Sequence, residues 1–288
     1  MEKEQVNDIQ LIHGVEYLIL NKIGEGTFGN VWLCCERGGD LFAIKVSKEY
    51  DKNYLEDMLA DDPDMTQRTT IDDFIDDDLK LCPELHTLLN NKYYPFVVKC
   101  YDSGIIPYTD VTADKLKNSY GENIAYVILQ YIKGSDMHMN PITSEDGLSS
   151  LCSSILSAVH TLGMSGIVPV DLNDTNVMYN VDDDCFTLVD IGGFGMFYDT
   201  QINIYISRTI KTFGHMIRGI TQYYVQDHNN IDKYIKQLTL HTITPKDALI
   251  LLSTIIHAPV HLYTIDTVTT YQNGEVISIQ AYGSLPNN

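Results

Sequence analysis

Short apolar runs bounded by turn residues mark the beginning of the chain as rich in β-structure. Residues 16–47 contain three such runs, at Tyr17–Ile23, Asn30–Cys35 and Leu41–Val46. Glycine-containing segments separate these runs, as is typical of strands joined by tight turns. Further along, Phe96–Tyr101 and Ile124–Tyr131 are predicted to be buried strands, with a polar loop between them at Pro107–Glu122.

Apolar residues at helical spacing dominate the remainder of the chain. The clearest case is Ser144–Met164, where one stripe is formed by Leu148, Leu151, Cys152, Ile155, Leu156, Val159 and Leu162. Helices are also predicted at Leu79–Asn91 and near residues 205–223, 230–240 and 245–257. Two short strands, Val177–Asn180 and Phe186–Asp190, are expected on either side of a turn at 181–184.

The end of the chain predicts a β-hairpin at about 265–282. Asn273-Gly274 lies between the strand-like segments Thr267–Gln272 and Glu275–Gln280, and this pair suits the positive φ angles of a type I′ turn. A β-rich beginning followed by a helical remainder predicts an α+β fold of two lobes. We expect the lobes at 1–133 and 134–288, joined near Lys133–Asp136.

An acidic segment at 50–78 interrupts the first lobe. From Asp51 to Asp78 it has eleven Asp and Glu residues against Lys52 and Arg68. We interpret it as a solvated insertion, and the alternative is a docking surface for a basic partner. The whole chain has a formal net charge of −20, which disfavours nucleic acid and anionic membranes and favours a basic protein or a cationic small molecule.

The remaining composition is that of an ordinary globular protein, with 44% hydrophobic residues. The six cysteines show no CxxC spacing, so neither a disulfide framework nor a zinc site is predicted. The first ten residues are charged and do not resemble a signal peptide, and no apolar run approaches the roughly 18 residues of a membrane span. We therefore expect a soluble protein that is located in the cytoplasm, either of its own cell or of a host cell.

The first candidate site combines a glycine-rich segment with a lysine. Residues 24–31 read Gly-Glu-Gly-Thr-Phe-Gly-Asn-Val between two predicted strands, so a hairpin could fold over phosphates with its backbone N–H groups. The alternative is a plain hairpin. Lys45 follows in the apolar strand, where its charge is costly to bury without an anion as partner. That anion is either a phosphate or a carboxylate from a helix. Glu84 is the candidate carboxylate, with Glu56 or a nearby Asp as alternatives.

In this order, the glycine loop, the strand lysine and the helix glutamate resemble those of eukaryotic-type protein kinases. The resemblance continues through residues 125–137. It implies that ATP is contacted by Gly24, Gly26, Thr27, Phe28, Gly29, Val31, Ala43 and Lys45. It also implies Leu129 as the gatekeeper, the backbone of Gln130 and Ile132 as adenine contacts, and Asp136 near the ribose.

The second half of the candidate site lies at residues 169–192. Asp171 and Asn176 are five residues apart, and Asp190 follows in the segment Leu-Val-Asp-Ile-Gly. Each of them alone could stabilise a turn. In the resembling family this spacing belongs to a catalytic Asp and to two magnesium ligands. The resemblance therefore implies ATP and Mg²⁺ as cofactors, Asp171, Lys45 and Glu84 as catalytic residues, and Asn176 and Asp190 as metal ligands.

Three departures from the family pattern stand out. Pro169-Val170 replaces the His-Arg that precedes the catalytic Asp, so control by activation-loop phosphorylation is not expected. Asn173 and Thr175 occupy the positions of the basic residues that contact the γ-phosphate. No Ala-Pro-Glu follows Gly192, and 96 residues remain after it. The short second lobe resembles the minimal kinases of viruses and of bacterial effectors.

These observations leave three hypotheses for function. The first is a Ser/Thr protein kinase that uses ATP and Mg²⁺ without activation-loop phosphorylation and acts on a protein substrate, for which a basic protein is favoured. The second is a pseudokinase whose acidic segment and C-terminal hairpin dock a protein partner. The third is a kinase-like enzyme with a non-protein acceptor, such as an aminoglycoside, or one that transfers a nucleotidyl group.

Overall fold

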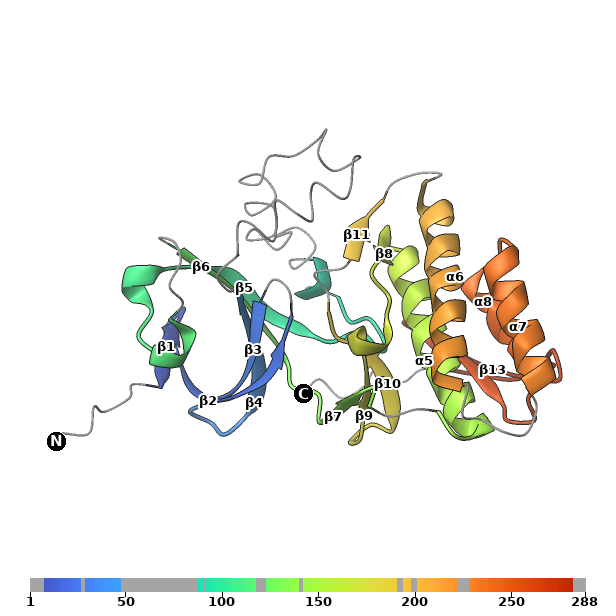
Figure 1. Cartoon of the computed structure of the whole chain (residues 1–288), viewed down its shortest axis with the longest axis horizontal. Coiled ribbons are helices and arrows are strands. Elements are labelled where there is room, and N and C mark those ends of the chain that lie inside the picture. The colour runs from blue at the N-terminus through green and yellow to red at the C-terminus, as the bar shows by residue number, and fades with distance from the viewer. Residues whose placement is uncertain are drawn as a thin grey trace. The chain divides into compact units, whose positions relative to one another are not determined.

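The computed structural model describes residues 8–26, 29–47, 88–90, 92–117, 123–139, 142–190, 194–197, 201–221 and 228–281 (Figure 1). The chain divides into two compact units. The first holds the described residues up to Lys92 together with Lys99–Tyr131. The second holds Tyr93–Val98 and the described residues from Ile132 onward. The acidic segment 50–78 and most of the predicted helix Leu79–Asn91 lie outside the described residues.

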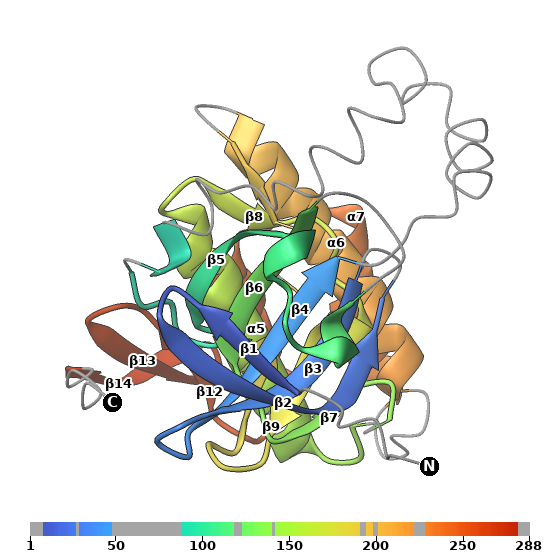
Figure 2. The same cartoon turned by 90° about the vertical axis from the view of Figure 1, so that its left-hand side faces the viewer.

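A curled antiparallel sheet forms the first unit (Figure 2). Its strands are β1 (Ile9–Ile12), β2 (Val15–Glu25), β3 (Gly29–Glu36), β4 (Leu41–Ser47), β5 (Cys100–Pro107) and β6 (Asn123–Gln130). They are arranged in the order β1-β2-β3-β4-β6-β5. The three strands predicted within residues 16–47 and the strand predicted at Ile124–Tyr131 are confirmed, and β1 is an addition that the pattern of apolar residues did not predict.

One of the two predictions for residues 96–122 is wrong. The predicted strand Phe96–Tyr101 is interrupted, because Phe96 has a φ of 61° and β5 begins only at Cys100. Val97 instead makes an isolated bridge to Leu188, within the second unit. The predicted loop at Pro107–Glu122 is confirmed over its described residues, where two 3₁₀ turns follow the end of β5. Three of its residues are buried: Val111, Ala113 and Leu116.

The core of the first unit lies on one face of the sheet. Ile44 is paired with Ile128, and Val46 with Tyr126, so these side chains point to the same side. The buried Gln10 fastens the turns at 108–116 over this side, since its amide oxygen accepts hydrogen bonds from the backbone N–H groups of Thr112 (3.0 Å) and Ala113 (3.3 Å). The uncharged amide thus satisfies backbone groups that would otherwise be buried without a partner.

Helices and small sheets form the second unit. The helices are α5 (Glu145–Gly163), α6 (Gln201–Thr221), α7 (His228–Leu240) and α8 (Pro245–Ser253). The three small sheets contain β7 (Gly134–Asp136), β9 (Val177–Asn180) and β10 (Cys185–Leu188); β8 (Ile167–Pro169) and β11 (Phe194–Met196); and β12 (Val260–Tyr263), β13 (Thr267–Gln272) and β14 (Glu275–Ala281). The four helices predicted beyond residue 140 and the strands of the predicted turn at 181–184 are confirmed. β7, β8, β11 and β12 were not predicted.

Helix α5 is the central element of this unit, and its sequence explains where it begins and which of its residues form the apolar stripe. Ser144 caps its first turn by accepting a hydrogen bond from the N–H of Gly147 (3.0 Å). The predicted apolar stripe is buried, and its residues are at most 1% exposed. The opposite side is buried as well, although it is formed by serines. The prediction of one buried stripe therefore underestimated how much of the helix is covered.

Three of these serines, one turn apart, bind the backbone of β12 and of the residue directly before it. Ser149 donates to the carbonyl oxygen of Pro259, Ser153 accepts from the N–H of His261 (2.9 Å), and Ser157 accepts from the N–H of Tyr263 (2.9 Å). The spacing of four residues places the hydroxyls in a row along the helix. We call Ser149, Ser153 and Ser157 the serine ladder. It takes the place of a neighbouring strand at this edge of the sheet.

The predicted C-terminal hairpin is confirmed over the described residues. Asn273 (φ 51°) and Gly274 (φ 82°) connect β13 to β14, as a type I′ turn requires. Tyr271 of β13 is 2% exposed and is paired with the buried Val260, so the hairpin belongs to the core of the unit. β14 lies at the edge of its sheet with three exposed apolar side chains: Val276, Ile277 and Ile279.

The described cysteines are free thiols, and Cys34, Cys100 and Cys152 are buried. Burial raises the pKa of Cys34 to about 12 and that of Cys100 to about 11, so both remain protonated at neutral pH. Among the described helices, none is long and apolar enough to cross a membrane.

Candidate functional site

The glycine-rich segment forms the tight connection between β2 and β3. Gly24 is paired with Val31, and the N–H of Gly26 donates to the carbonyl oxygen of Gly29 at 2.8 Å. The sequence predicted this position between two strands. Thr27 and Phe28, at the tip of the connection, lie outside the described residues. A role of these residues in binding phosphate stays a prediction.

Gly29 is required where β3 passes β4. A Cβ atom at Gly29 would lie 2.8 Å from the carbonyl oxygen of Val46, which is closer than real Cβ contacts, and 3.4 Å from Cγ of Lys45. The missing side chain therefore leaves room for the aliphatic part of Lys45 beside the glycine segment. Lys45 itself is half-buried.

The register of the sheet gathers the predicted nucleotide contacts on one face. Val31 is paired with Lys45, and Ala43 is paired with Leu129. Alternation along β4 places Ala43 and Lys45 on the side opposite the core residue Ile44. Val31, Ala43, Lys45 and Leu129 therefore share the face of the sheet that the core does not use. This face of the sheet therefore carries three apolar residues and one cation, and their predicted contact with a nucleotide stays a prediction.

The backbone at the end of β6 is hydrogen-bonded at Gln130, whereas at Ile132 it has no partner among the described residues. The N–H of Gln130 donates to the carbonyl oxygen of Lys99 at 2.8 Å, and the side chain of Gln130 accepts from the N–H of Lys99 at 3.4 Å. No described residue forms a hydrogen bond with the backbone of Ile132. Its N–H and C=O are therefore available to a ligand, as the predicted adenine contact requires.

Asp136 ends β7 and already has a local role. Its carboxylate accepts a hydrogen bond from the N–H of Met139 at 3.0 Å. The neighbouring N–H of Met137 donates to the carbonyl oxygens of Asp174 (3.1 Å) and Val177 (2.9 Å). These bonds tie the start of the second unit to the loop that carries Asp171. The predicted contact of Asp136 with a ribose stays a prediction.

Asn173 builds the loop between Asp171 and Asn176. It caps a short 3₁₀ turn at Asp174–Asn176, where its amide oxygen accepts from the N–H groups of Thr175 and Asn176, both at 3.0 Å. Its amide nitrogen donates to Oδ1 of Asp171 at 3.2 Å. The sequence predicted no role for Asn173 beyond the absence of a lysine. An Asn directly before Asp-Thr-Asn is, however, a capping signal that could have identified it.

Asn176 holds the other side of Asp171. Its amide nitrogen donates to the backbone carbonyl oxygen of Asp171 (2.9 Å) and to Oδ2 of the same residue (3.3 Å). The side chain of Asp171 is exposed, while Leu172 next to it is 2% exposed and anchors the loop. No described residue donates a hydrogen bond to the amide oxygen of Asn176. That oxygen is free to bind a cation.

The pairing of β9 with β10 brings Asp190 to the same place. Leu188 is paired with Val177, and the N–H of Val189 donates to the carbonyl oxygen of Asn176 at 3.0 Å. Asp190 therefore follows directly the residue that is bonded to Asn176. The second unit thus brings Asp190 next to the loop of Asp171 and Asn176, although Asp190 lies nineteen residues after Asp171 in the sequence.

The donor set around Asn176 suits magnesium better than zinc. Within the described ranges, no three His, Cys, Asp or Glu residues come together as a metal site. Asn176 and Asp190 carry side-chain oxygen atoms, and Mg²⁺ commonly takes one or two oxygen ligands from the protein and completes its shell with water and substrate phosphates. Their role as its ligands stays a prediction. Glu84, the predicted partner of Lys45, lies outside the described residues, so its role stays a prediction.

Comparisons with known proteins add evidence on the fold. No protein-family model matches the sequence, and no curated protein matches it. A crystal structure of the PknI kinase domain of Mycobacterium tuberculosis, a double mutant, is similar with a TM-score of 0.51 and 15% sequence identity. The match covers 84% of this chain and 92% of that domain. The chain therefore has a bilobal protein-kinase-like fold, with a curled β-sheet lobe and a mainly helical lobe.

Proposed function

We propose that this protein is an ATP- and Mg²⁺-dependent phosphotransferase that phosphorylates Ser or Thr residues of a protein substrate. The observation that carries the proposal is the loop at 171–176. Here the amides of Asn173 and Asn176 bind both carboxylate oxygens of Asp171, while the amide oxygen of Asn176 accepts nothing from a described residue. An exposed, oriented carboxylate beside a free amide oxygen is the arrangement that phosphoryl transfer needs.

Asp171 would position the acceptor hydroxyl and accept its proton. Two amide donors restrict the orientation of the carboxylate, and its side chain is exposed, so an acceptor can approach it. Such orientation lowers the entropic cost of bringing the acceptor to its reaction partner.

The residues that would hold the cofactors fit them chemically. Asn176 and Asp190 would bind magnesium through oxygen atoms, and Lys45 would pair with phosphates. Val31, Ala43 and Leu129 would provide an apolar surface for an adenine ring. The family resemblance assigns the edge of that ring to the backbone of Ile132, which bonds to no described residue. When bound, ATP supplies the phosphoryl group, and magnesium and Lys45 neutralise its charge.

The segment after Asp190 supports activity without activation-loop phosphorylation. Phe194 of β11 is paired with Pro169 of β8, and the hydroxyl of Thr209 donates to the carbonyl oxygen of Pro169 at 3.0 Å. These contacts hold the residue two positions before Asp171 without any charged group. Val170 is 46% exposed at the position where a phosphate-binding arginine would be expected.

A second candidate, a nucleotide-binding pseudokinase, is favoured by the same Asn173. Its side chain is committed to the cap and to Asp171, so this position provides no cation near a γ-phosphate. The loss of that cation would weaken the stabilisation of charge in the transition state. The two candidates share the binding site and differ in turnover.

Intact-mass spectrometry after incubation with ATP, Mg²⁺ and a basic test protein separates them. Wild type should add about 80 Da per phosphate to itself or to the test protein, while Asp171→Ala and Asp190→Ala should add none. Asp182→Ala, in an exposed turn, should behave as wild type. Equal labelling by wild type and both site variants would refute phosphotransfer at this site. Nucleotide binding without labelling would favour the pseudokinase, and a modified small molecule would identify a non-protein acceptor.

A further inference from the structure

The surface charge of the protein changes sign at helices α6 and α7. Residues 201–240 contain five Lys and Arg residues and only two acidic residues, Asp227 and Asp232, in a chain with 39 acidic residues against 19 basic ones. Helix α6 has no acidic residue in its 21 positions. Its basic residues recur at helical spacing and form one stripe: Arg208, Lys211, His215 and Arg218.

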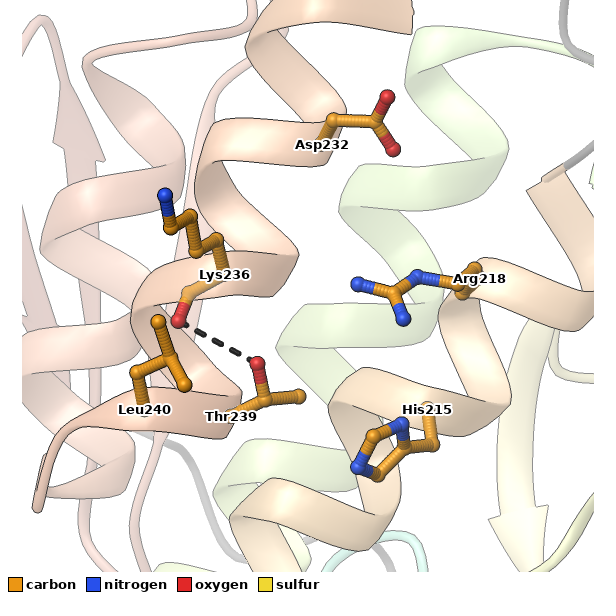
Figure 3. Close-up of a pocket in the computed structure, with 6 residues that line it drawn as sticks. All are labelled: His215, Arg218, Asp232, Lys236, Thr239 and Leu240. Atoms are coloured by element: carbon orange, nitrogen blue, oxygen red, sulfur yellow. Dashed lines mark hydrogen bonds between the residues drawn. The ribbon is translucent and has the colours of Figure 1, made fainter.

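A surface groove of about 680 Å³ lies between α6 and α7 and receives part of this stripe (Figure 3). It is lined by His215, Arg218, Asp232, Lys236, Thr239 and Leu240. In the close-up, the guanidinium group of Arg218 points from α6 toward α7. The helices are close at Gly214, where a Cβ atom would be 3.1 Å from both Leu238 and Thr239.

The cations of this groove, and Lys211 beside it on the stripe, have no ion-pair partner among the described residues. Across the described ranges, neither Arg218 nor Lys236 nor Lys211 forms an ion pair, whereas Lys22, Lys115, Lys117 and Lys133 each pair with an acidic residue. In so acidic a chain, carboxylates are abundant as partners. Asp232 also lines the groove but forms no ion pair with these cations, so their positive charges are available to an external ligand.

We propose that the α6–α7 groove binds an acidic, partly apolar peptide segment of a partner protein. Arg218, Lys211 and Lys236 would pair with its carboxylates, and the exposed Leu240 would contact an apolar residue. The stripe from Arg208 to Arg218 is roughly 15 Å long, which is the reach of about five extended residues. Asp232 at one end of the groove disfavours a compact, multiply charged anion and favours a ligand whose carboxylates are spread along the stripe.

This inference does not depend on phosphotransfer. None of the groove residues belongs to the site around Asp171, and the basic substrate proposed for that site has the opposite charge. The groove would instead recruit a protein through an acidic segment, so that binding and catalysis use different surfaces. Its test is therefore a binding measurement, whose outcome is independent of turnover.

The test uses full-length protein and a fluorescein-labelled decapeptide of alternating glutamate and leucine, followed by fluorescence anisotropy at low ionic strength. The net charge of −20 repels this probe, so any binding reports a local positive site. We expect saturable binding that the double variant Arg218→Glu/Lys236→Glu weakens by at least about tenfold. Because Glu near the end of α6 could disturb the helix, Arg218→Gln/Lys236→Gln serves as a milder second variant, with circular dichroism to check folding.

Two controls make the result decisive. Arg37→Glu/Lys92→Glu changes the net charge equally at exposed positions of the other unit and should leave binding unchanged. A glutamine–leucine decapeptide should not bind. The proposal is overturned if the acidic peptide does not bind, or if both pairs of charge reversals weaken its binding equally. It is also overturned if inorganic phosphate, added at the same total negative charge as the peptide, displaces the peptide completely.

Discussion

The side-chain amide of Asn176 donates a hydrogen bond to the backbone carbonyl oxygen of Asp171 at 2.9 Å, and so joins the two ends of a loop of six residues. Asn173 closes the same loop from within by binding Oδ1 of Asp171 and by capping the turn that follows. The loop thus uses its own side chains to hold the proposed catalytic carboxylate in place. Its geometry depends on two asparagines that act on one aspartate.

Substitution of Asn173 should separate the cap from the contact to Asp171. Asn173→Ala loses both and should lower the free energy of unfolding by about 1 kcal/mol and reduce phosphotransfer. Asn173→Asp keeps the capping oxygen but places a second negative charge beside Asp171, so stability should be retained while activity falls. Urea denaturation and initial rates measure the two effects. Equal losses of stability in both variants would contradict the assigned capping role.

A third variant of this residue tests the missing cation. Asn173→Lys restores the basic residue that Ser/Thr kinases have at this position, at the expense of the cap. If the lack of a cation limits the rate, the variant should be faster than Asn173→Ala despite equal destabilisation. A rate no higher than that of Asn173→Ala would mean that the loop geometry, and not the charge, limits turnover.

Gly29→Ala should destabilise the first unit and disturb Lys45. The added Cβ atom would lie 2.8 Å from the carbonyl oxygen of Val46, a backbone atom that cannot move aside without shifting β4. Overpacking of this kind costs about 1–3 kcal/mol. Gly38→Ala is the matched control, because nothing lies within 4 Å of its Cβ position. Urea midpoints of the two variants should differ clearly, and indistinguishable midpoints would disprove the close approach.

Removal of one hydroxyl of the serine ladder should leave a buried backbone group without a partner. Ser157→Ala removes the acceptor of the Tyr263 N–H and should lower the free energy of unfolding by about 1–3 kcal/mol. Ser150→Ala, on the same helix and with no such bond to a strand, should change it by less than about 0.5 kcal/mol. Chemical denaturation of both variants tests the difference. A loss no larger in Ser157→Ala than in Ser150→Ala would contradict the role of the ladder.

Stability should decrease as the pH falls below neutrality. Burial lowers the pKa of His160, with a further contribution from Lys246, and burial also lowers the pKa of His261. Below the ordinary value of 6.5, the unfolded chain binds protons that the folded protein does not, so acidification favours unfolding. Urea midpoints should therefore drop between pH 7.5 and 5.5.

Replacement of both histidines tests this cause. His160→Gln/His261→Gln should show a smaller drop over the same range, whereas the exposed His241→Gln should show the drop of wild type. If the double variant loses stability with pH as steeply as wild type, other groups are responsible.

Stabilisation by nucleotide should depend on magnesium through Asp190. ATP with Mg²⁺ should raise the melting temperature of wild type, because a ligand that binds only the folded state shifts the unfolding equilibrium. Asp190→Asn should lose the part of the shift that depends on Mg²⁺, and Lys45→Met most of the shift. Asp266→Asn, an exposed residue of the β12–β13 connection, is the control. A full magnesium-dependent shift in Asp190→Asn would remove Asp190 from the metal site.

The sequence predicted the elements with strong local signals. The strands at the beginning of the chain alternate around short turns, α5 has a cap and an apolar stripe, and Asn273-Gly274 admits one type of turn, so local preferences already determine these parts. The motif spacing also singled out Asp171, Asn176 and Asp190. The pairing of β9 with β10 places Asp190 beside the loop that holds the other two, and the roles of all three stay predictions. Where local signals and tertiary contacts agree, the sequence is sufficient to predict the helices, strands and turns.

The failures have tertiary causes. Residues 96–98 are apolar and look like a strand, but Val98 and Leu188 bond to one another, so this segment packs with the second unit. The serines of α5 read as a polar face, yet strand backbones bury them. The role of Asn173 was missed because the comparison with a family pattern showed which side chain was absent and did not show what the present one does.

The serine ladder leaves the sheet of β12, β13 and β14 with one edge at which another strand can be added. Hydroxyl groups of α5 already occupy the backbone of β12, so an additional strand cannot pair there. At the opposite border, β14 follows β13, and no further strand of the described chain pairs with it. The sheet therefore ends permanently on the helix side and can be extended on the other side only.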